Sequence, residues 1–167
     1  MQRRRNRGTP EILKRFIPTV LAVLSLDQAS KILVEKFLPL GHSIFVLPIF
    51  ALTHVQNTGA AFGVLAHSNR LFIGLTVIIL ALLVKMHKDL TAQGAWARVG
   101  IAFVWGGALG NMADRLRNGA VTDFLDVFWK TWHWPAFNVA DSAITVGVCL
   151  LLIQNVLGAR TTPEIEK

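Results

Sequence analysis

The sequence contains four long apolar stretches, at about residues 16–34, 71–84, 99–112 and 137–157. A helix needs about 20 residues to cross the hydrocarbon core of a bilayer. Hydrophobic residues make up 53% of the 167-residue chain and charged residues only 16%, with a mean hydropathy of +0.48. A soluble domain carries about 25% charged residues, so four such stretches leave too little polar sequence to surround them in water. The sequence therefore predicts an integral membrane protein, mainly α-helical.

We expect four transmembrane helices in a single membrane domain of residues 1–167, at about residues 16–34, 70–87, 96–113 and 137–157. The second and third stretches reach this length because Arg70, Lys85 and Arg98 can extend their charged ends toward the headgroups. The alternative is that these stretches form buried core helices of a soluble protein.

The distribution of lysine and arginine orients these spans. Eleven of these residues lie in the two tails and the loop at 85–98, five lie in the opposite loops, and Lys31 lies inside the first span. The positive-inside rule then places both termini in the cytoplasm. The net charge of +7 suits an anionic membrane surface rather than nucleic acid. The basic start also resembles a secretory signal peptide, but Asp27 and Lys31 interrupt the apolar run, so we interpret it as a retained span.

The outer loops are then residues 35–70 and 113–136. Ser43–Val55 is rich in β-branched and aromatic residues and is interrupted by Pro48, which predicts two short strands at about 43–55. The turn signal Asn57-Thr58-Gly59 follows. Trp129, Trp132 and Trp134 are expected to anchor the outer interface, although a role in gripping a substrate is an alternative.

Polar residues in the spans gather in mid-membrane or the outer half. Asp27 and Lys31 are four residues apart on one helix face, which predicts an ion pair. Gly106 and Gly110 form a small-xxx-small pair that allows another helix to approach closely. The polar positions that follow on the third and fourth spans are Asn111, Asp114, Arg115, Asn138, Asp141, Ser142 and Thr145, and Asp123 lies in the loop between these spans.

Three carboxylates, Asp114, Asp123 and Asp141, lie within 28 residues, with only Arg115 and Arg117 close in sequence. Two carboxylates in a poorly solvated site share a proton, so one can activate water while the other donates a proton, as in an aspartic peptidase. Spacing alone does not decide between Asp114, Asp123 and Asp126. A purely structural polar network, a proton-coupled transporter or channel, and a non-enzymatic assembly factor remain as alternatives.

Other hydrolase chemistries fit the sequence poorly. It contains no G-x-S-x-G elbow and no H-E-x-x-H zinc motif, and its five histidines are scattered. Cys149 is the single cysteine, so it forms no intrachain disulfide, and it lies in the cytoplasmic half of the fourth span. We expect neither a metal nor a cofactor.

Five segments, in order, resemble the signatures of lipoprotein signal peptidase, the bacterial signal peptidase II family. They are Asp27–Lys31 (DQASK), Asn57–Phe62 (NTGAAF), Gly106–Asn111 (GGALGN) with Asp114 and Arg115, Val121–Phe124 (VTDF) and Phe137–Ser142 (FNVADS). The resemblance covers about residues 20–157. It implies a four-span inner-membrane enzyme with a small sheet and a short helix on its outer, periplasmic face.

The resemblance also implies an activity and a set of site residues. The family cleaves prolipoproteins on the N-terminal side of a diacylglyceryl-modified cysteine and is inhibited by globomycin. Its catalytic aspartates match Asp123 and Asp141. The supporting or substrate-binding positions match Asp27, Lys31, Asn57, Gly59, Asn111, Asp114, Arg115 and Asn138. Membrane lipid is an expected partner, and a monomer would suffice.

Overall fold

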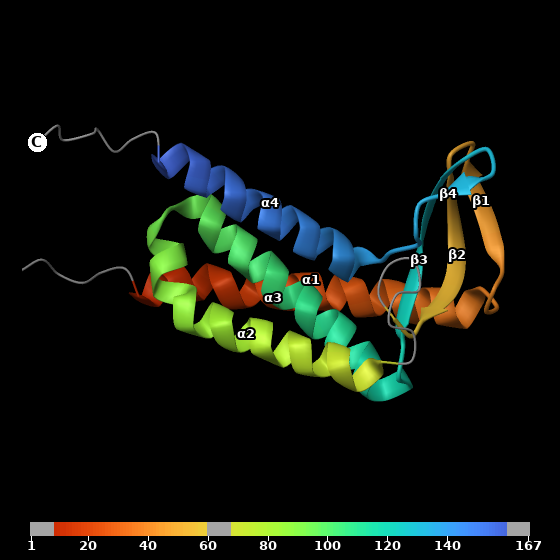
Figure 1. The fold of residues 1–167 in the computed structure, drawn as a ribbon, viewed down its shortest axis with the longest axis horizontal. Coiled ribbons are helices and arrows are strands. Elements are labelled where there is room, and N and C mark those ends of the chain that lie inside the picture. Colours follow the sequence, from red (N-terminus) through yellow and green to blue (C-terminus); the bar gives the residue numbers. More distant parts are fainter. Residues whose placement is uncertain (1–8, 60–67, 160–167) are drawn as a thin grey trace, which may run out of the picture.

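The computed structural model describes residues 9–59 and 68–159. Within them the helices are α1 (Thr9–Phe37), α2 (Asn69–Ala92), α3 (Ala95–Asn118) and α4 (Val139–Ala159). The strands are β1 (Ser43–Leu47), β2 (Phe50–Asn57), β3 (Val121–Trp129) and β4 (Trp132–His133). The helices form an elongated bundle with the sheet across one end, while α1 begins and α4 ends at the opposite end (Figure 1). The expected mainly helical protein with a small sheet is confirmed.

Helix α3 is the centre of the bundle and packs against α1, α2 and α4. Glycines on α3 permit this close packing. A Cβ atom at Gly106 would lie 2.6 Å from Cβ of Val23 on α1, and one at Gly107 would collide with the carbonyl oxygen of Ala140 on α4. At Gly110 the space for a Cβ atom is taken by the carboxylate of Asp27. The close approach predicted at Gly106 and Gly110 is therefore present, and α1 is the helix that approaches.

In the described part of the chain, three helical segments are long and apolar enough to cross a membrane: Arg15–Phe37, Asn69–Ala92 and Val139–Leu157. Large apolar side chains on them face outward, including Leu26, Val84 and Leu152, each about 60% or more exposed. Helix α3 has 24 residues, or about 36 Å at 1.5 Å per residue, so it is also long enough. It carries the polar cluster described below and is less apolar, and its crossing of the membrane stays a prediction.

The sheet has the order β1-β2-β3-β4 and is antiparallel throughout. The hairpin of β1 and β2 turns at Pro48 and Ile49, as the sequence predicts. Strand β3 was not predicted, because residues 113–136 were expected to form an outer loop. Its segment VTDFLDVFW alternates little between buried and exposed positions, and it pairs with β2, far away in sequence. Asp123 consequently lies on a strand rather than in a loop.

The turn between α3 and β3 brings Asp123 close to the polar residues at the end of α3. Helix α3 ends at Asn118, and Gly119 follows in the left-handed conformation (φ 73°) with its N–H donating to the Arg115 carbonyl. This turn directs the chain into β3, so Asp123 follows five residues after the C-terminal end of α3 at Asn118. The expected short helix on the outer face has no counterpart among residues 9–59 and 68–159.

Candidate active site

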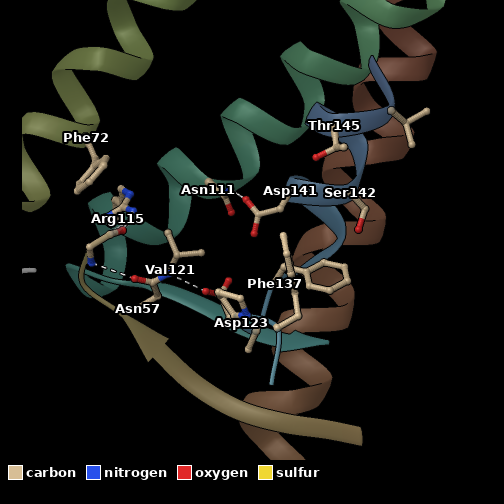
Figure 2. Close-up of a pocket in the computed structure, with 15 residues that line it drawn as sticks. Asn57, Phe72, Asn111, Arg115, Val121, Asp123, Phe137, Asp141, Ser142 and Thr145 are labelled. Carbon is tan, nitrogen blue, oxygen red and sulfur yellow. Dashed lines mark hydrogen bonds between the residues drawn. The ribbon is translucent and has the colours of Figure 1, made fainter. Parts of the chain in front are cut away.

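A cavity of about 630 Å³ lies where the ends of α2, α3 and α4 nearest the sheet meet it. Figure 2 shows Asp123 on β3 and Asp141 on α4 pointing toward this space, with Arg115 and Phe72 at its other side. The polar lining residues are Asn57, Asn111, Arg115, Asp123, Asp141, Ser142 and Thr145. The apolar ones include Phe72, Val121, Phe137 and Val146. The cavity thus combines a mostly apolar wall with two carboxylates.

Asp123 is 2% exposed, and both of its carboxylate oxygens accept a hydrogen bond from an asparagine amide. The Nδ2 atom of Asn57 donates to Oδ2 at 2.8 Å, and Nδ2 of Asn138 donates to Oδ1 at 2.7 Å. Burial raises the pKa of the Asp123 carboxyl from its ordinary 3.8 to about 7, and the nearby Asp141 adds to the rise. The hydrogen bonds from Asn57 and Asn138 oppose it. A carboxyl with this pKa holds a proton near neutral pH and can release it.

Asp141 lies in the first turn of α4, where Asn138 caps the helix. The Asp141 N–H donates to Oδ1 of Asn138 at 2.9 Å, and the Asn138 N–H donates to Oδ2 of Asp141 at 3.3 Å. This reciprocal pair has the pattern of a capping box, with an aspartate in the place usually taken by glutamate. The remaining oxygen, Oδ1, accepts from Nδ2 of Asn111 at 2.7 Å. The same contacts that begin the helix therefore fix the carboxylate.

Lys31, Asp27 and Asp114 form a fully buried ion cluster that contacts the cavity-lining Asn111 through Lys31. The Lys31 ammonium lies 2.8 Å from Oδ2 of Asp27, which confirms the predicted pair, and 2.8 Å from Oδ2 of Asp114. The backbone near each cavity carboxylate is tied to this cluster. The Ala140 N–H donates to Asp27 at 2.9 Å, and the Thr122 N–H donates to Asp114 at 3.3 Å.

Gln28 is a member of this cluster that sequence reasoning missed. Its amide donates to Asp114 at 2.9 Å and to Asp27 and the Gly110 carbonyl at 3.2 Å. The sequence did offer a signal for this role, because Gln28 directly follows Asp27 in the DQASK segment. The contacts link α1 to α3 across the bundle and help to satisfy both buried carboxylates.

Arg115 is close in sequence to Asp114 and Asp123, but its contacts are with Gly59 and Phe72. Its Nη2 atom donates to the Gly59 carbonyl at 2.8 Å, and its guanidinium lies over the Phe72 ring at 4.4 Å. Within residues 9–59 and 68–159 it has no carboxylate oxygen within 4 Å. Asn57 also holds this segment, since its Oδ1 accepts from the Gly59 N–H at 2.9 Å. Gly59 is therefore fixed through both of its backbone groups.

The geometry separates the aspartates that sequence spacing left open. Asp123 and Asp141 line one cavity, whereas Asp114 is taken up by the ion cluster. Asp126 is not among the lining residues; it accepts from Thr53 at 3.1 Å and lies 2.9 Å from Nδ1 of His133. Of Asp114, Asp123, Asp126 and Asp141, the two that face a common cavity are therefore Asp123 and Asp141.

Comparisons with known proteins point to one family. A family model described as "Signal peptidase (SPase) II" matches residues 19–157. The lipoprotein signal peptidase of Geobacter sulfurreducens is 48% identical over 142 residues, covering 83% of this chain and 89% of that protein. That of Coxiella burnetii is 41% identical over 149 residues, covering 87% and 91%.

Two solved structures, both titled as a bacterial membrane enzyme structure by the in meso method, are similar in fold. The first, at 2.3 Å resolution, has a TM-score of 0.84 and 33% identity, covering 93% of this chain and 95% of that one. The second, at 1.9 Å resolution, has a TM-score of 0.75 and 33% identity, covering 86% and 94%.

Proposed function

The chain belongs to the signal peptidase II family, the aspartic peptidases that remove signal peptides from prolipoproteins, and on this premise we propose that Asp123 and Asp141 are its catalytic pair. The observation that carries the proposal is the shared cavity, in which the two carboxylates are the acidic lining residues. No other pair of aspartates in the described chain has this arrangement. The bond cleaved is the one on the N-terminal side of a diacylglyceryl-modified cysteine.

In the proposed reaction the pair holds one proton. The raised pKa of Asp123 supports this residue as the proton carrier, with Asp141 as the base. Asp141 takes a proton from water as its oxygen attacks the scissile carbonyl carbon, while Asp123 gives its proton to the carbonyl oxygen. The tetrahedral intermediate then collapses: one of its hydroxyl groups returns a proton to Asp123 as the C=O bond re-forms, the C–N bond breaks, and the proton on Asp141 passes to the leaving amine of the cysteine.

The supporting residues act on this pair in three groups. Asn57, Asn111 and Asn138 donate to the carboxylates. Arg115 holds Gly59 at the cavity wall. Asp27, Lys31 and Asp114 anchor the backbone next to each catalytic aspartate, as described above.

A non-enzymatic assembly factor would have a basic partner for each carboxylate. Asp27 and Asp114 meet that expectation through Lys31. In the described part of the chain, Asp123 and Asp141 instead accept only from side-chain amides and a backbone N–H. Two carboxylates in one cavity with no cation in direct contact are unfavourable for structure alone, so this difference supports the enzymatic function.

The proposed setting is the outer face of the bacterial inner membrane, with the termini in the cytoplasm and the whole chain as one four-span, monomeric domain. Strand β1 is exposed over its whole length and carries Phe45 at 72% exposure. Trp129, Trp132 and Trp134 are also more than half exposed. Such a surface suits the lipid interface, where the diacylglyceryl group would deliver the substrate.

The direct test uses the purified protein in detergent with a diacylglyceryl-modified precursor. A shift to the cleaved size on a gel, dependent on the lipid modification and blocked by globomycin, is the expected result. Cleavage of an unmodified precursor at an equal rate would reject the proposed substrate, and no cleavage of the modified precursor would reject the function.

A further inference from the structure

The three asparagines of the site share one feature: each amide oxygen accepts from a group that can only donate. Oδ1 of Asn57 accepts from the Gly59 N–H, and Oδ1 of Asn138 accepts from the Asp141 N–H, both at 2.9 Å. Oδ1 of Asn111 accepts from the Lys31 ammonium, also at 2.9 Å. An amide that presents its oxygen to such a donor must direct its NH₂ group the other way. All three NH₂ groups therefore point at the two carboxylates.

As a result, each of the four carboxylate oxygens accepts one N–H from the protein. Asp123 accepts from Asn57 and Asn138, and Asp141 accepts from Asn111 and the Asn138 backbone. For Asn57 and Asn138 the orienting donor is a backbone N–H two or three residues along the chain. Asn111 differs, since its orienting donor is a side chain on another helix, 80 residues away.

We propose that Lys31 is a positioning residue of the reaction: its ammonium group holds the Asn111 amide so that the NH₂ group faces Asp141. The inference rests on the proposed catalytic role of Asp141, and it gives Lys31 a function beyond that of a helix-to-helix ion pair.

The contacts of Lys31 favour this role. An ammonium has three N–H groups and no acceptor, and Lys31 directs them to Asp27, Asp114 and Asn111 at 2.8, 2.8 and 2.9 Å. The two carboxylates would be enough for a buried ion cluster. The third contact goes instead to a neutral amide whose other end touches the catalytic carboxylate at 2.7 Å. Every donor of Lys31 is thus used, and one of them reaches the site.

Without Lys31 the Asn111 amide loses this constraint. Its Oδ1 would keep only the Nδ2 donor of Asn138, at 3.2 Å. The amide could then rotate and bring its oxygen against the Asp141 carboxylate, where two acceptors repel. The charged groups in contact with Lys31 are Asp27 on α1 and Asp114 on α3. Arg117 lies 3.6 Å from the Asp114 carboxylate. Asp123 and Asp141 at the cavity also lie within the electrostatic reach of Lys31.

The test is a double-mutant cycle on purified protein with a diacylglyceryl-modified precursor. The variants are Lys31→Met, Asn111→Ala and the double variant. Lys36→Met is the matched control, because it is the same change at an exposed lysine on the outer end of the same helix. We expect Lys31→Met to lower kcat on the order of 100-fold, as misplacement of a reacting group does, with little change in KM.

Two further readouts separate positioning from mere stability. In the double variant, Lys31→Met should add almost nothing to the loss caused by Asn111→Ala, because both act through one amide. The pH profile of kcat/KM in Lys31→Met should also move to higher pH, since a cation that favours the ionised carboxylates is gone. Additive losses, an unchanged kcat or an effect on KM alone would overturn the inference.

Removing Lys31 leaves the buried carboxylates of Asp27 and Asp114 without their cation, so Lys31→Met could fail to fold. Lys31→Met/Asp114→Asn is therefore tested beside Asp114→Asn, because it leaves the three-residue cluster with one net negative charge, as in the wild type. The kcat of Lys31→Met/Asp114→Asn should be lower than that of Asp114→Asn by the same factor, on the order of 100-fold. Equal kcat in these two variants would reject the role of Lys31. Failure of the wild type to cleave would reject the proposed function instead, so the two failures are distinguishable.

Discussion

Asn138 donates to Oδ1 of Asp123 at 2.7 Å while its own amide oxygen caps the helix that carries Asp141. One side chain thus joins β3 to the start of α4 at the point where the two proposed catalytic groups meet. Its position is itself fixed, since Asn138 is fully buried. The separation between the two carboxylates therefore depends on helix initiation as well as on the sheet.

Asp123→Asn and Asp141→Asn should each abolish cleavage while leaving a folded, membrane-inserted protein. Asparagine keeps the shape of the side chain but cannot share a proton or act as a base. A loss on the order of 10⁴-fold in kcat is expected for each, and the double variant should be little worse because the pair acts as a unit. Cleavage of the modified precursor by purified variants is the measurement.

Asp126→Asn is the matched control for this pair, since Asp126 lies on the same strand, is buried and does not line the cavity. It should cleave at close to the wild-type rate. Near-normal turnover by Asp123→Asn together with loss in Asp126→Asn would transfer the catalytic role to Asp126. Normal turnover by Asp141→Asn would end the aspartate-pair mechanism.

The pH dependence of cleavage follows from Asp123. Because its pKa is raised to about 7, it is protonated below that pH and ionised above it. The mechanism needs its proton, so kcat/KM should fall as the pH rises through about 7. Asn57→Ala removes a hydrogen bond that favours the ionised form, and the fall in its residual activity should come at higher pH. A profile that keeps rising to pH 9 would contradict this assignment.

Gly107→Ala should destabilise the bundle by about 1–3 kcal/mol, because the added methyl collides with the Ala140 carbonyl. Gly74→Ala on α2 is the control, since nothing lies within 4 Å of its Cβ position. That change should be neutral or slightly stabilising. Thermal unfolding in detergent measures both. Since Ala140 precedes Asp141, Gly107→Ala should also lose activity at temperatures where it is still folded.

Cysteine labelling in intact cells tests the orientation. In a Cys149→Ala background, a cysteine at Gln93 between α2 and α3 should resist an impermeant reagent added outside, because the positive-inside rule puts that loop in the cytoplasm. A cysteine at Leu40, exposed between α1 and β1, should react. The reverse pattern would invert the proposed topology and move the cavity to the cytoplasmic face.

Local spacing predicted part of the site. Asp27 and Lys31 are four residues apart on one helix, so their pairing follows from helix geometry. The contact of Lys31 with Asp114 did not follow, because it depends on how α1 packs on α3. The glycines at 106 and 110 indicated a close approach but could not name the partner helix.

Strand β3 shows a second limit on what the sequence alone could predict. Its β-branched and aromatic composition was available in the sequence, but a strand also needs a partner, and the residues of β2 that pair with it lie 64 to 77 positions earlier. Helix α3 extends to Asn118, beyond the expected 113, and the Asn118-Gly119 pair that ends it was a usable signal. Spacing alone could not favour Asp123 over Asp126; β3 decides which of the two lines the cavity, and the catalytic role of Asp123 stays a prediction.

The polar wall of the cavity has a consequence for resistance to inhibitors. Asn57, Asn111, Asp123 and Asp141 bind one another as well as facing the cavity. A substitution that denied an inhibitor its hydrogen bond to one of them would also release a proposed catalytic carboxylate. Escape would be confined to the apolar wall, at positions such as Phe72, Val121 and Val146. A compound that binds through the polar groups alone leaves the cell few substitutions that preserve the enzyme.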